Sequence, residues 1–102
     1  MPTVDAAVRR LTYELEHSRV TGAAALKLIH GYGSSGHGGR IRVEARKYLE
    51  RQKKLRKFHD FITGETFSIF NPATLDAFRR CGELRRDPDL ERHNNGVTFI
   101  IF

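Results

Sequence analysis

The last six residues, VTFIIF from Val97 to Phe102, constrain the fold more than any other stretch of the chain. This run is almost continuously apolar, whereas a strand with one face in water alternates apolar and polar side chains. We therefore expect a strand in the interior of a sheet, buried on both faces. A chain of 102 residues holds one modest core, so residues 1–102 are expected to form a single domain.

The spacing of apolar residues and the turn residues between them predict the other elements. Helices are expected near residues 4–19, 40–55 and 72–81, and strands near 24–29, 58–62 and 97–102. Thr3 can cap the first helix, and Asn71-Pro72 is a typical helix start. The order helix, strand, helix, strand, helix, strand predicts an α/β chain of the α+β two-layer kind, with a small mixed sheet covered by helices.

Three details of the second half are also predicted. Leu75 and Phe78 are expected to face inward from the third helix. The stretch TFSIF, residues 66–70, is expected to be a further extended piece. The charged segment ELRRDPDLERH, residues 83–93, has mixed charges and is interpreted as an ordinary exposed connection.

Net charge gives the first indication of function. Eighteen Lys and Arg residues against twelve Asp and Glu residues give a formal charge of +6. Nine of the basic residues lie between Arg40 and Lys57, a stretch that holds only two acids, Glu44 and Glu50. Such a surface favours a polyanion, most commonly nucleic acid. The alternative is a charged face that serves only solubility.

Other features narrow the class of protein. No apolar run approaches the roughly 20 residues of a membrane-spanning helix, so no membrane partner is expected. The N-terminal stretch MPTVDAAVRR does not resemble a signal peptide, and the single Cys81 excludes an internal disulfide. These features predict a cytoplasmic protein. His17, His59 and His93 have no ligand at metal-binding spacing, so neither a metal site nor a cofactor is expected.

The stretch KLIHGYGSSGHGGRIR, Lys27 to Arg42, joins the end of a strand to the start of a helix. Ligands of α/β sheets often bind beyond the carboxyl ends of strands, and helix N-termini attract anions. The loop lacks the Gly-Lys-Ser/Thr ending of a Walker loop. GYGSSG, Gly31 to Gly36, matches the dinucleotide pattern G-x-G-x-x-G, but the helix begins too late and no complete βαβ unit follows. A phosphate-binding corner remains the best interpretation.

The stretch LKLIHGYGSSGHGGRIRVEARKYL resembles the Smr (small MutS-related) domain, with its strand, HGxG loop, further glycines and following helix. TVDAAVRRLTYELEHSRVTG resembles the first helix of that family, and the final NNGVTFIIF fits its C-terminal half. The resemblance implies a β-α-β-α-β-β core similar to the C-terminal domain of a translation initiation factor. It also implies binding to DNA or RNA, with nicking or cleavage in several members.

The chain departs from the family pattern at its N-terminus. Family members usually carry a strand with LDxH before the first helix, and this chain has Met1-Pro2 at that point. Either the protein starts upstream of Met1 or this copy lacks that strand. If the strand is absent, the one at 24–29 loses a neighbour, and such an exposed edge invites pairing with another chain. We therefore expect a homodimer or strand exchange through residues 24–29.

Three functional hypotheses follow. The first is a nucleic-acid-binding module in which glycines shape the loop, cations bind phosphates and a tyrosine either stacks on a base or packs on the helix. Its expected contacts are Gly31, Tyr32, Gly33, Gly38, Gly39, Arg40, Arg42, Arg46 and Lys47. The second is an endonuclease with His30 as the catalytic candidate, Asp60 as the nearest candidate carboxylate and a divalent metal as an optional cofactor. The third is an interaction module whose basic face meets an acidic partner, for example on a ribosome.

Overall fold

The computed structural model describes residues 3–31 and 37–102. In chain order the elements are α1 (Val4–Val20), β1 (Ala25–Ile29), α2 (His37–Lys54), β2 (Asp60–Thr63), the 3-10 helix η1 (Gly64–Thr66), α3 (Pro72–Arg80), the 3-10 helix η2 (Gly82–Arg86) and β3 (Val97–Ile101). The predicted helices and strands are all present, and α2 begins three residues earlier than expected. None of the described helices is long and apolar enough to span a bilayer.

The sheet has the order β1-β3-β2, and β3 pairs antiparallel with both neighbours. Ile100 of β3 lies opposite Leu26 on one side and Phe61 on the other. All five residues of β3 are buried. The central, doubly covered position predicted for the last strand is therefore confirmed.

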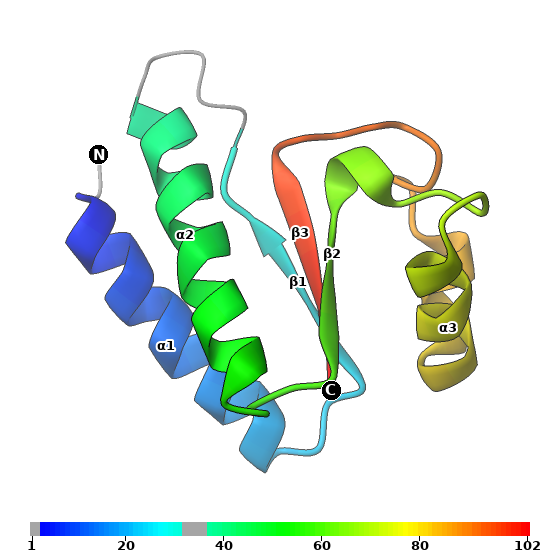
Figure 1. Cartoon of the computed structure of the whole chain (residues 1–102), viewed down its shortest axis with the longest axis horizontal. Coiled ribbons are helices and arrows are strands. Elements are labelled where there is room, and N and C mark those ends of the chain that lie inside the picture. The colour runs from blue at the N-terminus through cyan, green and yellow to red at the C-terminus, as the bar shows by residue number, and fades with distance from the viewer. Residues whose placement is uncertain (1–2, 32–36) are drawn as a thin grey trace.

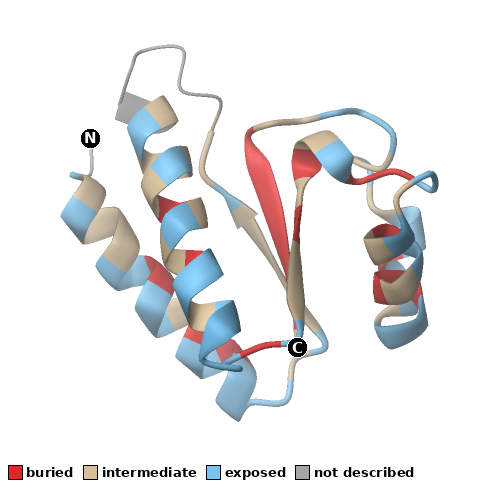
Figure 2. Cartoon of the chain, in the orientation of Figure 1, coloured by how far each residue is buried: buried red, intermediate tan, exposed pale blue. Residues whose placement is uncertain are grey.

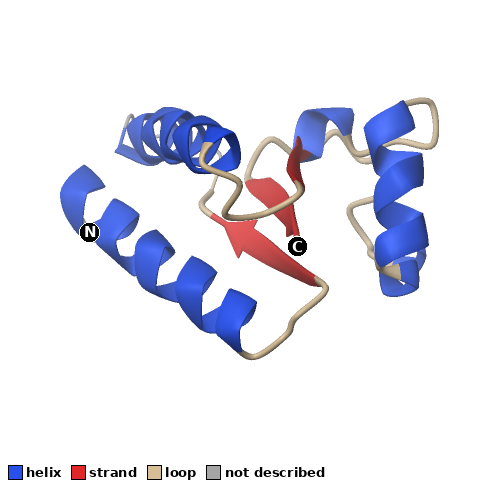
Figure 3. Cartoon of the chain, turned by 60° about the horizontal axis from the view of Figure 1, so that its bottom comes forward, coloured by secondary structure: helices blue, strands red, loops and turns tan. Residues whose placement is uncertain are grey.

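Helices cover both faces of the sheet. In Figure 1, α1 and α2 lie side by side on one face and α3 lies on the other; Figure 3 shows the same arrangement from below. Alternate residues of β3 serve the two faces: Ile100 packs with Leu11 and Leu49 of the long helices. Phe99 packs with residues around α3. The α+β class expected from the sequence is confirmed. The sheet of the described residues is antiparallel and not mixed as expected, because β3 pairs antiparallel with both neighbours, and helices cover both of its faces instead of one.

Two helix starts form as the sequence predicts. The Thr3 hydroxyl accepts a hydrogen bond from the Ala6 N–H at 3.1 Å, and the Asn71 side chain accepts one from the Ala73 N–H at 3.1 Å. Each bond satisfies one of the N–H groups that a helix leaves free in its first turn. These signals are local, which is why they can be recognised without the structure.

The expectation that Leu75 faces inward is wrong. Leu75 is 41% exposed, and α3 buries Thr74, Ala77 and Phe78 instead. The hydroxyl of Thr74 donates to the Thr66 carbonyl oxygen at 3.3 Å, which turns that polar residue toward the interior. A short helix with few apolar residues does not define its buried face by hydrophobicity alone.

The extended piece expected at residues 66–70 is also absent. The chain leaves β2 through η1, and Phe67 is fully buried just after it, with its ring centroid 4.1 Å from that of Phe99. Gly64 makes this turn possible, because a Cβ atom at that position would collide with the backbone oxygen of Asn94. The turn therefore forms by close backbone contact, which excludes a continuing strand.

The segment at residues 83–93, expected to be an exposed connection, makes partly buried ion pairs with β1. Asp87 and Asp89 both reach the Lys27 ammonium, at 3.1 and 2.7 Å, and that ammonium lies 5.5 Å from the Phe99 ring centroid. These carboxylates are mostly buried, with side-chain exposures of 15% and 18%. The segment thus ties the second half of the chain to β1.

Candidate nucleic-acid interface

The glycine loop begins at a turn that the fold holds firmly. The N–H groups of His30 and Gly31 both donate to the Gly96 carbonyl oxygen, at 3.0 and 3.1 Å. Gly31 has φ +85°, a conformation that side-chain-bearing residues adopt only with strain. Gly96 lies so close that a Cβ there would be 3.2 Å from the Gly31 carbonyl carbon. Gly31 therefore begins the loop in a backbone conformation that favours glycine.

The side chain of His30 is engaged at both ring nitrogens. Nδ1 lies 3.1 Å from the Gly31 carbonyl oxygen, and Nε2 lies 2.9 Å from the hydroxyl of Thr98, a fully buried residue. Because a carbonyl oxygen only accepts, Nδ1 carries the proton and Nε2 accepts from Thr98. Burial lowers the pKa of His30, and the charges of Arg46 and Arg42 act in the same direction. The imidazole is therefore neutral near pH 7.

Arg46 joins the same hydrogen bonds through Thr98, and its guanidinium is bound by the Glu65 carboxylate. Its guanidinium forms two hydrogen bonds of 2.7 Å with the Glu65 carboxylate, and its Nε donates to the Thr98 hydroxyl at 3.3 Å. Burial would raise the pKa of Glu65, but the hydrogen bonds from Arg46, a backbone N–H bond and the charges of Arg46 and Arg42 together lower it. The sequence placed Arg46 among the phosphate contacts; in the fold its charge is directed at Glu65.

The other predicted cations lie along α2. Arg40 and Lys47 are exposed, and Lys47 is 3.5 Å from the Glu44 carboxylate. Arg42 is partly buried, and its charge lowers the pKa of both His30 and Glu65, which places it near that pair.

The glycine-rich part of the predicted site is described only in part. The first turn of α2 contains Gly38 and Gly39 and no acidic residue. Backbone N–H groups and positive charge therefore meet at this end of the helix. The predicted contacts Tyr32 and Gly33 fall outside the described residues.

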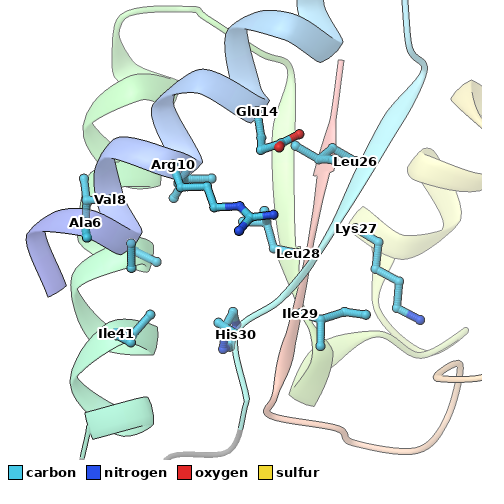
Figure 4. Close-up of a pocket in the computed structure, with 13 residues that line it drawn as sticks. Ala6, Val8, Arg10, Glu14, Leu26, Lys27, Leu28, Ile29, His30 and Ile41 are labelled. Carbon is cyan, nitrogen blue, oxygen red and sulfur yellow. The ribbon is translucent and has the colours of Figure 1, made fainter. Parts of the chain in front are cut away.

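A groove adjoins His30 between α1, β1 and the start of α2. It has a volume of about 800 Å³ and is lined mainly by apolar side chains such as Leu11 and Leu28. Figure 4 shows Arg10 and Glu14 reaching from α1 toward β1, with His30 at one end of the groove. Sequence reasoning did not single out these two residues. Their spacing of four on a helix was the available signal, because it places them on one face.

The candidate carboxylate Asp60 is not near His30. Asp60 pairs with Ile101, whereas the His30 N–H donates to Gly96, so the two lie at opposite ends of β3, roughly 17 Å apart along the strand. The Asp60 carboxylate is bound by Lys53 at 2.9 Å. That assignment was wrong. Among residues 3–31 and 37–102, no group of three or more His, Cys, Asp or Glu side chains could hold a metal ion.

Comparison with known proteins agrees with the motif at the loop. No curated protein and no solved structure matches the chain. The family model of the Smr domain matches residues 1–65, which contain α1, β1, the glycine loop, α2 and β2 together with most of η1. Smr domains bind nucleic acids or act as nicking endonucleases. On this match over more than half its length, the chain belongs to the Smr domain family.

Proposed function

We propose that this chain binds nucleic acid by its phosphates at the start of α2. One observation carries the proposal: α2 begins directly after the glycine loop, with no acid in its first turn and with the exposed Arg40 beside it. Free N–H groups and the helix dipole favour an anion there, and Arg40 and Arg42 add full positive charges. The single cysteine suits a reducing cytoplasm, and nucleic acid is abundant in that compartment.

The test is a salt titration of binding to fluorescein-labelled DNA and RNA of mixed sequence. Affinity should fall linearly with salt on logarithmic axes, because phosphate binding releases counterions. Replacing Arg40 and Arg42 with Ala should lower the slope by about two and weaken all sequences alike, since phosphate contacts carry no base information. DNA and RNA are compared in the same experiment because phosphates do not distinguish them.

The control removes an equal charge from another face. Arg85→Ala with Arg86→Ala acts in η2, on the α3 side of the sheet (Figure 1). Arg85 lies 5.3 Å from the Phe78 ring centroid, so thermal unfolding must confirm that the control variant is folded. Equal weakening by both double variants would mean that only net charge matters, and the proposed site would be wrong.

A second candidate function is nicking of the bound strand. The observation that favours it is His30, a neutral imidazole that lines the groove also reached by Glu14. To act as a base, Nε2 must exchange its Thr98 partner for water, and a divalent metal could supply the activated water instead. Nicking of supercoiled DNA, or cleavage of RNA, with and without Mg²⁺ tests this function. His30→Asn should abolish cleavage while leaving the salt slope of binding unchanged.

We also propose that β1 is a pairing edge, because β3 is its one strand partner among the described residues. Leu26 and Leu28 pair through their backbone groups with β3, so the N–H and C=O groups of Ala25, Lys27 and Ile29 point outward. In a homodimer formed through this edge, those three amides should become protected from hydrogen exchange as concentration rises. Rapid exchange at every concentration, with a monomeric mass, would contradict pairing.

A further inference from the structure

The basic residues of α2 fall into two groups, and one group forms a stripe facing solvent. Its members are the exposed side chains of Arg40, Lys47, Arg51 and Lys54. They are separated by seven, four and three residues, so at 3.6 residues per turn all four share one face of the helix. In Figure 2, exposed segments in pale blue recur along the solvent side of α2. We call these four residues the outer stripe.

The second group points toward β2 and η1 and is neutralised there. Arg46 binds Glu65 at 2.7 Å, and Lys53 binds Asp60 at 2.9 Å. Those cations hold the helix to the sheet. Their charge is directed at a fixed carboxylate, so it contributes little to attracting a ligand.

The cations of the outer stripe have almost no carboxylate partners within the described part of the chain. Within the described part of the chain, Arg40, Arg51 and Lys54 have no ion pair, and Lys47 has only the contact of 3.5 Å with Glu44. Both members of that contact are well exposed, so its worth is small. An exposed row of like charges destabilises its own helix slightly by repulsion. A bound polyanion would remove that repulsion.

The outer stripe is also long enough to contact several successive phosphates of a linear ligand. From position 40 to 54 a helix rises roughly 21 Å, the length of about six base pairs of a duplex. Beyond the end of α2, Arg56 and Lys57 are also exposed, but they line a pocket with Lys53 and so are not part of the outer stripe. The row starts at the first turn of α2 and runs away from it, with two acids beside it: Glu44, and the exposed Glu50 next to Lys47 and Lys54.

We propose that the outer stripe is a track for one nucleic-acid backbone, which leaves the glycine loop and follows α2 to Lys54. This inference rests on the proposed function and extends it, because it adds Arg51 and Lys54 as phosphate contacts and sets a length for the ligand. The track recognises charge and spacing without reading bases. The expected ligand is a strand or duplex longer than the loop alone can hold, within the roughly 4–16 nucleotides common for single-strand sites.

The experiment measures salt slopes by fluorescence anisotropy for labelled mixed-sequence DNA of about 4 and about 24 nucleotides, as single strands and, for the longer probe, as a duplex. Arg51→Ala with Lys54→Ala should lower the slope by about two for the long probes. The same variant should leave the short single strand unaffected, because the loop end can hold it alone.

A matched pair of neighbours gives the control. Lys54→Ala removes an outer-stripe charge, whereas Lys53→Ala removes an equal charge one residue away that is already bound to Asp60. Lys54→Ala should lower the long-probe slope by about one, and Lys53→Ala by clearly less. Equal effects from the two neighbours would overturn the track, because long-range attraction would then account for the result.

The outcomes also separate this inference from the function on which it rests. If Arg40→Ala with Arg42→Ala lowers the slope and Arg51→Ala with Lys54→Ala does not, the track is wrong and the loop site stands. If no probe binds, both proposals fail. If polyglutamate binds through the outer stripe and nucleic acid of neither length competes, the stripe serves an acidic protein and the track is overturned.

Discussion

The two sides of α2 carry similar charges and use them differently. On the side facing β2 and η1, Arg46 and Lys53 are bound to Glu65 and Asp60 at 2.7 and 2.9 Å. On the solvent side, Arg51 and Lys54 have no ion pair with any described residue. One helix thus holds cations that stabilise the fold and cations that remain available to a ligand.

This difference shows why net charge alone predicts a binding surface poorly. Of the nine basic residues between Arg40 and Lys57, two, Arg46 and Lys53, are neutralised by acids that the fold brings to them. What matters for a polyanion is where unpaired charge remains and whether it is continuous. On α2 it is continuous along one face, and that face begins at the glycine loop.

The largest expected effect is a loss of stability when a cation on the sheet-facing side of α2 is removed. Arg46→Ala would leave the Glu65 carboxylate without its two short hydrogen bonds and would remove a donor from the buried Thr98. Because this pair is only partly buried, we expect a loss of about 1–2 kcal/mol in the free energy of unfolding. Urea unfolding at pH 7 measures it.

Lys54→Ala is the matching change on the solvent side. Its side chain is exposed, so its effect on the same free energy should stay within about 0.5 kcal/mol. In binding experiments the order should reverse, with Lys54→Ala lowering the salt slope and a folded Arg46→Ala variant lowering it less. If both substitutions destabilise the fold equally, the division of α2 into two sides is wrong.

The next prediction concerns how the contribution of Arg46 to the free energy of unfolding depends on pH. Burial would raise the pKa of Glu65, but the hydrogen bonds and charge of Arg46, with a backbone N–H bond and the charge of Arg42, lower it below the ordinary carboxyl value. A carboxyl whose pKa is lowered in the folded state stabilises the fold above its unfolded pKa of about 4.3, and this stabilisation disappears as pH falls through the folded value.

The difference in unfolding free energy between wild type and Arg46→Ala should therefore be greatest above about pH 5 and shrink toward pH 3. Other carboxylates with lowered pKa, such as Asp89, are present in both proteins and cancel in this difference. A difference that stays constant from pH 7 to pH 3 would show that Arg46 acts through packing and not through its charge.

Much of the fold could be predicted because its signals are local. The continuous apolar run at 97–102 required a covered central strand, and Thr3 and Asn71 were recognisable caps. The glycine loop was recognised for a similar reason, since its residues are contiguous. Its start at Gly31 has the positive φ that a glycine permits.

The partners of the charged residues could not be predicted, because they are distant in sequence. Arg46 meets Glu65 across nineteen residues, and Lys27 meets Asp87 across sixty. Nothing in a local pattern distinguishes Lys53, which is paired with Asp60, from Lys54, which has no ion pair among the residues that the structure describes. For the same reason Arg46 was expected to bind phosphate, and Asp60 was expected near His30. Only the arrangement of strands decides such pairings.

The smallest expected effect comes from an acid within the outer stripe, Glu44. Glu44 lies between Arg40 and Lys47 on that face, and its carboxylate is 3.5 Å from the Lys47 ammonium. Glu44→Gln should strengthen binding to the long DNA probe by roughly two- to threefold at low salt, because it removes a negative charge from the proposed backbone path. Anisotropy titrations at about 50 mM salt measure the gain, which should disappear near 300 mM as screening increases.

Glu65→Gln is the appropriate control for Glu44→Gln. It removes the same charge from the side of α2 facing the sheet, where the carboxylate is bound to Arg46. This variant should be less stable than wild type, and it should strengthen binding less than Glu44→Gln because the charge that it unmasks lies off the outer stripe. Glu44→Gln should leave the free energy of unfolding almost unchanged, since an exposed pair at this distance contributes little. If the two variants strengthened binding equally, the ligand would be responding to the total charge of the domain, and the two sides of α2 would not differ in function.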